Sequence, residues 1–82
     1  MPPLRLTLRV FGPARDIVGG KEVVVEVDGL DVKALRSHLT SQFPKLQAFN
    51  SLLIAVNQKY ASDEISLHET DEIAVIPPVS GG

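Results

Sequence analysis

The sequence predicts an α+β domain in which one helix packs against one face of a single mixed β-sheet. Three observations lead to this fold class. Strand-like periodicity occurs towards both ends of the chain, helical periodicity occurs only near the middle, and 82 residues suffice for one compact core. A hydrophobic share of 44% is too high for a disordered chain. The predicted order is β-β-α-β-β, with a fifth short strand as an option.

The N-terminal third predicts two paired strands. Residues 4–11, LRLTLRVF, alternate with a period of two, so Val10 faces the core and Phe11 faces the opposite side of the sheet. Residues 12–20 begin with Gly-Pro and end with Gly-Gly, which predicts a loop. Residues 21–27, KEVVVEV, are rich in β-branched side chains and predict a second strand that can pair with the first.

A helix of about three turns follows the turn at DGLD. Apolar side chains recur there at helical spacing, at Val32, Leu35, Leu39 and Phe43. Asp31 can cap the N-terminus of this helix with its carboxylate, and the helix must have ended before Pro44.

The C-terminal half predicts the remaining strands. Residues 51–57, SLLIAVN, form a continuous apolar run, which predicts a strand buried on both faces. A short edge strand is expected around Tyr60. Residues 63–72 hold five of the ten acidic residues and predict a loop anchored by Leu67, in which Asp71 and Glu72 are solvated turn charges. Residues 71–76 predict the last strand, with two side chains inward (Ile73, Val75) and two outward (Ala74, Ile76).

Composition excludes several function classes. The net charge is −2 and the basic residues are scattered, so we expect no nucleic-acid partner and no membrane association. The N-terminus lacks the apolar stretch of a signal peptide, and the chain has no cysteine, so the expected location is the cytoplasm. His38 and His68 have no carboxylates at ligand spacing around them, and we expect two surface histidines and no metal site.

The order of elements suits a β-grasp, ubiquitin-like fold, in which the helix covers one sheet face and leaves the other open. If the first and last strands are neighbours, Phe11, Ala74 and Ile76 share the open face, and Tyr60 can join them. Two interpretations are open: a patch that docks a partner protein, or apolar side chains scattered on the surface.

The chain ends in PPVSGG, which separates a predicted domain at residues 1–76 from a C-terminal tail at residues 77–82. Pro77 and Pro78 hold the chain extended and end the last strand. The tail can project on the order of 15 Å, at roughly 3.3 Å per residue. Its last glycines have no Cβ, so they can thread a narrow channel. The residues assigned to threading are Pro77, Pro78, Val79, Ser80 and Gly81. The alternative is an idle end.

Four segments, VFGPARDIVG, VKALRSHL, LLIAVNQKY and DEIAVIPPVSGG, resemble the small sulfur-carrying subunit of molybdopterin synthase, the MoaD family. The resemblance covers nearly the whole chain. One departure is HETDE, at residues 68–72, where many relatives have a glycine-containing turn.

The resemblance implies that Gly82 is the reactive residue, although the chain itself is not an enzyme. An E1-like enzyme would use ATP to adenylate Gly82, and a sulfur donor would convert the adenylate to a thiocarboxylate. The tail would then deliver sulfur to a cyclic pyranopterin precursor in the active site of the large catalytic subunit, in a heterotetramer. No cofactor would be bound by this chain.

Three alternatives stay open: a sulfur carrier for another pathway such as thiazole synthesis, a ubiquitin-like modifier joined to lysines, and a binding module with an inert end. Arg9, Arg15 and Arg36 receive no role from the sequence and are interpreted as solvated charges.

Overall fold

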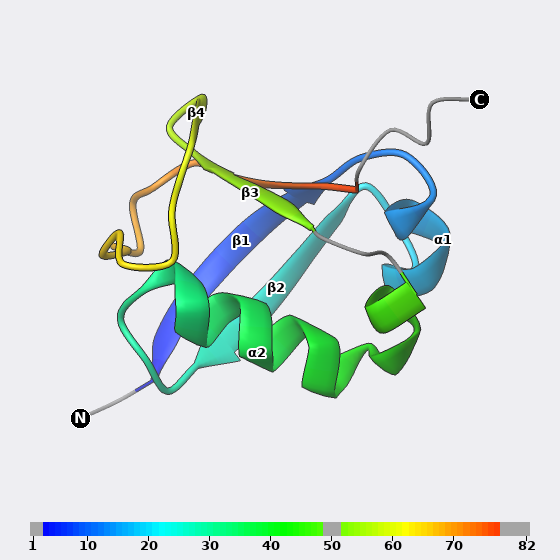
Figure 1. Ribbon diagram of the computed structural model, residues 1–82, viewed down its shortest axis with the longest axis horizontal. Helices are drawn as coiled ribbons and strands as arrows, with labels where there is room; N and C mark the ends of the chain where they lie inside the picture. Colours follow the sequence, from blue (N-terminus) through cyan, green and yellow to red (C-terminus); the bar gives the residue numbers. More distant parts are fainter. Residues whose placement is uncertain (1–2, 49–51, 78–82) are drawn as a thin grey trace.

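The computed structural model describes residues 3–48 and 52–77, which form a five-stranded mixed sheet with the main helix across one face (Figure 1). The elements in chain order are β1 (Leu4–Val10), α1 (Ala14–Val18), β2 (Glu22–Val27), α2 (Val32–Gln42), η1 (Pro44–Ala48), β3 (Leu53–Val56), β4 (Lys59–Tyr60) and β5 (Ile73–Ile76). The sheet order is β2-β1-β5-β3-β4. Only β1 and β5 run parallel, and the other pairs are antiparallel. The predicted fold class and the optional fifth strand are confirmed.

The segment between β1 and β2 corrects one prediction, because it contains the short helix α1 instead of a loop. Pro13 supplies a helical φ of −63° at the N-cap, and Ala14 is fully buried against the core. Gly19 ends the helix in the left-handed conformation, with its N–H bonded to the Arg15 carbonyl. The Gly-Pro and Gly-Gly pairs therefore mark the two ends of a helix that is too short to show a period.

The core lies between α2 and the inner face of the sheet. Three side chains of α2 are buried there, Val32, Leu35 and Leu39, as the helical spacing predicts. Asp31 caps α2 by accepting a hydrogen bond from the Ala34 N–H at 2.9 Å. Phe43 is only half-buried at the C-cap.

The prediction that the apolar run at β3 is buried on both faces is correct only in part. Leu53 is 39% exposed, whereas Ile54 and Val56 lie in the core. The reason is that helices cover only one face of this sheet, so a continuous apolar strand leaves alternate side chains on the open face. Ala55 on that face is nevertheless buried, at 7% exposure.

The acidic segment between β4 and β5 is anchored by Leu67, which is buried as predicted. Its N–H donates to the Leu30 carbonyl, and Ser66 forms an isolated bridge with Asp31. These bonds hold the segment beside the start of α2. No helix in the described ranges is long and apolar enough to cross a membrane.

Candidate functional site

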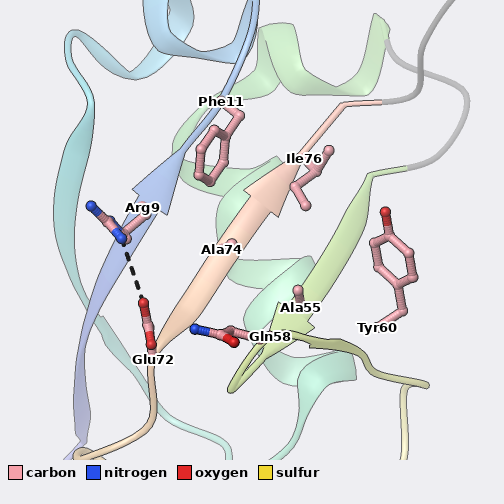
Figure 2. A pocket seen from close by; sticks show the side chains of 8 residues that line it. All are labelled: Arg9, Phe11, Ala55, Gln58, Tyr60, Glu72, Ala74 and Ile76. Atoms are coloured by element: carbon pink, nitrogen blue, oxygen red, sulfur yellow. Dashed lines mark hydrogen bonds and ion pairs between the residues drawn. The ribbon is translucent and has the colours of Figure 1, made fainter.

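The outer face of the sheet contains a hollow of about 380 Å³ that extends along β5 (Figure 2). The structure brings all four residues of the predicted docking patch to its wall or floor: Phe11, Tyr60, Ala74 and Ile76. Phe11 is 39% exposed and Tyr60 is 72% exposed, so two aromatic side chains lie at the surface. Whether this patch binds a protein stays a prediction.

The hollow follows from the pairing of four strands. Arg9 of β1 pairs with Ala74 of β5, Ala74 pairs with Ala55 of β3, and Ala55 pairs with Tyr60 of β4. These four residues form one row across the outer face, with two alanines in the middle and two long side chains at its ends (Figure 2). Because the two alanine side chains at the centre of the row are short, the surface of the protein is lower there than at the Arg9 and Tyr60 ends. The lining residues that the sequence did not predict are Arg9, Ala55, Gln58 and Glu72.

The turn between β3 and β4 positions one rim of this hollow. Asn57 and Gln58 both have positive φ, at 53° and 71°, as the central residues of a type I′ hairpin turn require. The Asn57 side chain accepts from the Glu72 N–H at 3.0 Å and donates to the Asp71 carboxylate at 3.1 Å. The turn is thereby tied to the start of β5. The Asn in Val-Asn-Gln-Lys is the sequence signal that could have indicated this turn.

Asp71 is a structural residue, which corrects its interpretation as a solvated charge. Its side chain is only 13% exposed and accepts a hydrogen bond from the His68 N–H at 2.8 Å. The backbone hydrogen bond from His68 and the side-chain hydrogen bond from Asn57 hold the pKa of the Asp71 carboxyl below its usual value. The Asp71 carboxylate therefore closes the HETDE turn.

Cationic side chains lie beside Phe11. The Arg15 guanidinium lies 5.7 Å from the centre of the Phe11 ring, and its Nε donates to the Val10 carbonyl at 2.9 Å. Arg9 approaches Glu72 at 3.5 Å as an exposed ion pair, drawn as a dashed line in Figure 2. A smaller hollow of about 120 Å³ separates Phe11 from Lys21. The apolar patch thus has a basic margin on its β1 side.

Arg36 is also not a simple solvated charge. Its Nη1 donates to the Leu52 carbonyl, and its Nε lies 3.3 Å from the Asp63 carboxylate. The side chain therefore links α2 to the residue before β3 and to the acidic segment.

The predicted tail begins differently from the expectation. Pro77 is buried, and a Cβ added to Gly12 would lie only 3.3 Å from its ring. Pro77 therefore packs against the body of the protein. Its predicted successors in the tail, Pro78, Val79, Ser80, Gly81 and Gly82, lie outside the described residues.

The histidines do not come together. His68 lies at the surface beside Asp71, whereas the half-buried His38 bonds to Gln42 on α2. Among residues 3–48 and 52–77, no three histidine or acidic side chains gather where they could hold a metal ion.

Comparison with solved structures supports the fold. The Methanosarcina acetivorans small archaeal modifier protein 1 matches with a TM-score of 0.79 and 25% identity, over 98% of each chain. A protein–protein complex of subunits 1 and 2 of the molybdopterin-converting factor from Helicobacter pylori contains a chain that matches with a TM-score of 0.65 and 25% identity. That match covers 96% of this chain and all of the other.

Comparison with known sequences identifies the family of this chain. The model of the ThiS family matches residues 8–82. A molybdopterin synthase sulfur carrier subunit from Caenorhabditis briggsae is 40% identical over 76 residues, which cover 88% of this chain and 90% of that protein. The chain therefore belongs to the ThiS family and, within it, to the molybdopterin synthase sulfur carrier subunits.

Proposed function

We propose that this chain carries sulfur for molybdenum cofactor biosynthesis as a thiocarboxylate on Gly82. The observation that carries the proposal is the 40% identical relative, a sulfur carrier subunit of molybdopterin synthase. It is supported by the family match, which extends through residue 82. The complete absence of cysteine is consistent with it, because no side-chain thiol competes with the terminus as a sulfur carrier.

Activation is needed because a terminal carboxylate is an anion at neutral pH and resists nucleophiles. An E1-like partner enzyme supplies ATP, and a carboxylate oxygen of Gly82 attacks the α-phosphate, with pyrophosphate as the leaving group. Sulfide released by a sulfur donor then attacks the acyl carbon; the new C–S bond forms as the C–O bond to AMP breaks, and loss of a proton leaves the terminal thiocarboxylate. We expect this cycle in the cytoplasm, with no cofactor held by the chain.

Delivery takes place in the large catalytic subunit, within a heterotetramer. The tail enters the active site of that subunit, and sulfur passes to the cyclic pyranopterin precursor in two rounds that build the dithiolene. The H. pylori complex of two converting-factor subunits supports a large-subunit partner. On this proposal the chain is a co-substrate that is spent and recharged, and the large subunit supplies the catalytic groups.

The hollow on the outer face is the proposed docking surface. Phe11, Ile76 and Tyr60 offer apolar area beside the strand that leads into the tail. Burying each such side chain contributes about 1.5–3 kcal/mol, so a few of them suffice to anchor a partner.

Mass spectrometry tests the proposal directly. The chain, incubated with ATP, the E1-like enzyme and a sulfur donor, should gain the mass difference between one sulfur and one oxygen at its C-terminus. Deleting Gly82 should abolish this gain and all sulfur transfer, with an unchanged melting temperature as the control for folding. Gly81→Ala should slow activation, because its Cβ obstructs a narrow channel. If the full-length chain gains no mass under conditions that charge a known carrier, the proposal is wrong.

A second candidate is a ubiquitin-like modifier, favoured by the likeness to the small archaeal modifier protein. It predicts isopeptide-linked conjugates in cell extracts that disappear when Gly82 is deleted. A sulfur carrier for thiazole synthesis is a third candidate, and the family model supports it equally. Reconstitution with thiazole synthase or with the molybdopterin synthase large subunit distinguishes these two pathways.

A further inference from the structure

We propose that the contact between Gly12 and Pro77 sets the direction in which the C-terminal segment leaves the domain, which makes Gly12 a positioning residue for the chemistry at Gly82. This inference rests on the proposed function, since it concerns the delivery of the same terminus. Gly12 lies far from Gly82 in sequence, in the turn between β1 and α1.

Strand pairing places these two residues together. β1 and β5 are parallel neighbours, and Val10 pairs with Val75. Two residues further along each strand, the chain reaches Gly12 and Pro77. A Cβ on Gly12 would lie 3.3 Å from the Pro77 Cγ and 3.9 Å from its Cδ. A side chain at position 12 would therefore require the proline ring to shift by a few tenths of an ångström.

Backbone hydrogen bonds hold the turn that contains Gly12 on both sides. The Phe11 N–H donates to the Val75 carbonyl at 3.1 Å, which ties the turn to β5. The Gly12 carbonyl accepts from the Arg15 N–H at 3.0 Å, at the start of α1. Gly12 itself has a φ of +62°, which costs little for glycine and more for other residues. Pro77 thus rests on backbone that has little freedom to move.

The contact matters because the chain continues from Pro77 to Gly82. The φ of Pro77 is restricted, so the position of its ring limits, together with ψ, the direction of the next peptide bond. Five residues follow Pro77, and a rotation of about 10° moves any point about 15 Å from the rotation axis by roughly 3 Å. A misplacement of about 1 Å at a reacting centre can cost on the order of a hundredfold in rate.

A matched pair of glycine variants isolates the contact. Gly12→Ala adds both backbone strain and a clash with the Pro77 ring. Gly19→Ala adds the same kind of strain, because Gly19 has a φ of +91°, but its new Cβ meets nothing within 4 Å. Thermal melts of both variants report the shared strain. Any effect found only in Gly12→Ala then comes from the displaced proline.

The first readout needs no partner protein. Since the chain has no cysteine, Lys45→Cys accepts a single nitroxide label on the exposed side of η1. Paramagnetic broadening of the Gly81 and Gly82 amide signals then reports their distances from the label. We expect Gly12→Ala to change this broadening at least twofold and Gly19→Ala to preserve the wild-type pattern. Equal patterns in all three proteins would overturn the proposal.

The second readout is the rate at which the E1-like enzyme forms the thiocarboxylate. We expect Gly12→Ala to lower kcat at least tenfold with KM unchanged, since the side chains of the docking patch are retained and only the terminus is misdirected. Gly19→Ala should retain the wild-type kcat, and the same kcat in both variants would contradict the inference. If wild type itself is not charged, the proposed function fails, and the broadening experiment still decides the role of Gly12.

A reciprocal variant covers the case in which Gly12→Ala does not fold. Pro77→Ala removes the ring from the other side of the contact and leaves the Gly12 turn unchanged. It should alter the broadening of the tail signals and lower kcat as Gly12→Ala does. Wild-type values of both quantities in Pro77→Ala would overturn the proposal.

Discussion

The two faces of the sheet are built from the same strands but have opposite environments. On the inner face, Leu6, Leu8 and Ile73 are fully buried under α2. On the outer face, Phe11 and Tyr60 remain exposed around the hollow. Because side chains alternate along a strand, adjacent residues serve either the core or the open surface. A substitution that lowers the stability of the fold and one that weakens partner binding should therefore be found only one or three positions apart in the sequence.

Ile73 and Ile76 provide the most direct comparison, because they are the same residue type at the two ends of β5. Ile73→Ala should lower the free energy of unfolding by about 3 kcal/mol, since it leaves a cavity in the core. Ile76→Ala should cost less than about 1 kcal/mol, as its side chain already contacts solvent. Urea denaturation measures both values. Similar losses in the two variants would mean that the outer face is part of the folding core.

On the outer face, we expect substitutions to reduce the affinity for the large subunit more than the stability of the fold. Phe11→Ala should weaken binding to the large subunit by about 2 kcal/mol, or roughly 30-fold in Kd. Val24→Ala is the matched control, because Val24 is also an exposed apolar residue but does not line the hollow. Calorimetric titration should find its Kd unchanged. A loss of affinity in Val24→Ala equal to that of Phe11→Ala would argue against a localised docking patch.

Substitution of Asp71 tests how much the hydrogen-bonded turn at residues 68–72, beside the hollow, contributes to the stability of the fold. Asp71→Ala should cost about 1–2 kcal/mol of stability at neutral pH, because it removes the partners of the His68 N–H and Asn57. The folded-state pKa of Asp71 lies below its usual value, so the ionised form stabilises the fold. This contribution is complete above about pH 4 and is lost as the pH falls through the lowered pKa.

Denaturation curves at several pH values measure this dependence. The difference in stability between wild type and Asp71→Ala should shrink on acidification. A difference that is constant down to about pH 2 would show that the carboxylate charge is irrelevant.

The smallest effect is expected for the exposed ion pair on the outer face. Arg9 and Glu72 should have a coupling energy below about 0.5 kcal/mol, because solvent screens both charges. A double-mutant cycle with Arg9→Gln and Glu72→Gln measures it. A coupling above about 1 kcal/mol would show that this pair helps to hold β1 and β5 together.

Local patterns predicted most of the fold. The alternation in residues 4–11 and 71–76 gave the correct inward and outward sides of β1 and β5, and the helical spacing gave α2 with its Asp31 cap. Helix α1 was missed, because its five residues span little more than one turn and show no period. Leu53 was assigned to the wrong environment, because an apolar run does not show how many sheet faces are covered.

The site was predicted in part. All four residues of the patch line one hollow, but the roles of Asp71 and Arg36 depend on partners that are distant in sequence. Composition had suggested solvated charges at both positions. Hydrogen bonds between a side chain and a remote backbone group have no signature in a single sequence, since they depend on how separate segments approach one another.

The sequence by itself determined the elements, the alternation that separates core from surface, and the Gly-Gly end on which the proposed function depends. These features follow from short-range geometry, because two-residue and 3.6-residue periods are properties of a segment alone. Only the tertiary structure decided which residues meet across strands. Two features depend on the register between β1, β3, β4 and β5: the row of side chains from Arg9 to Tyr60 and the contact between Pro77 and Gly12. Packing of the whole sheet sets this register.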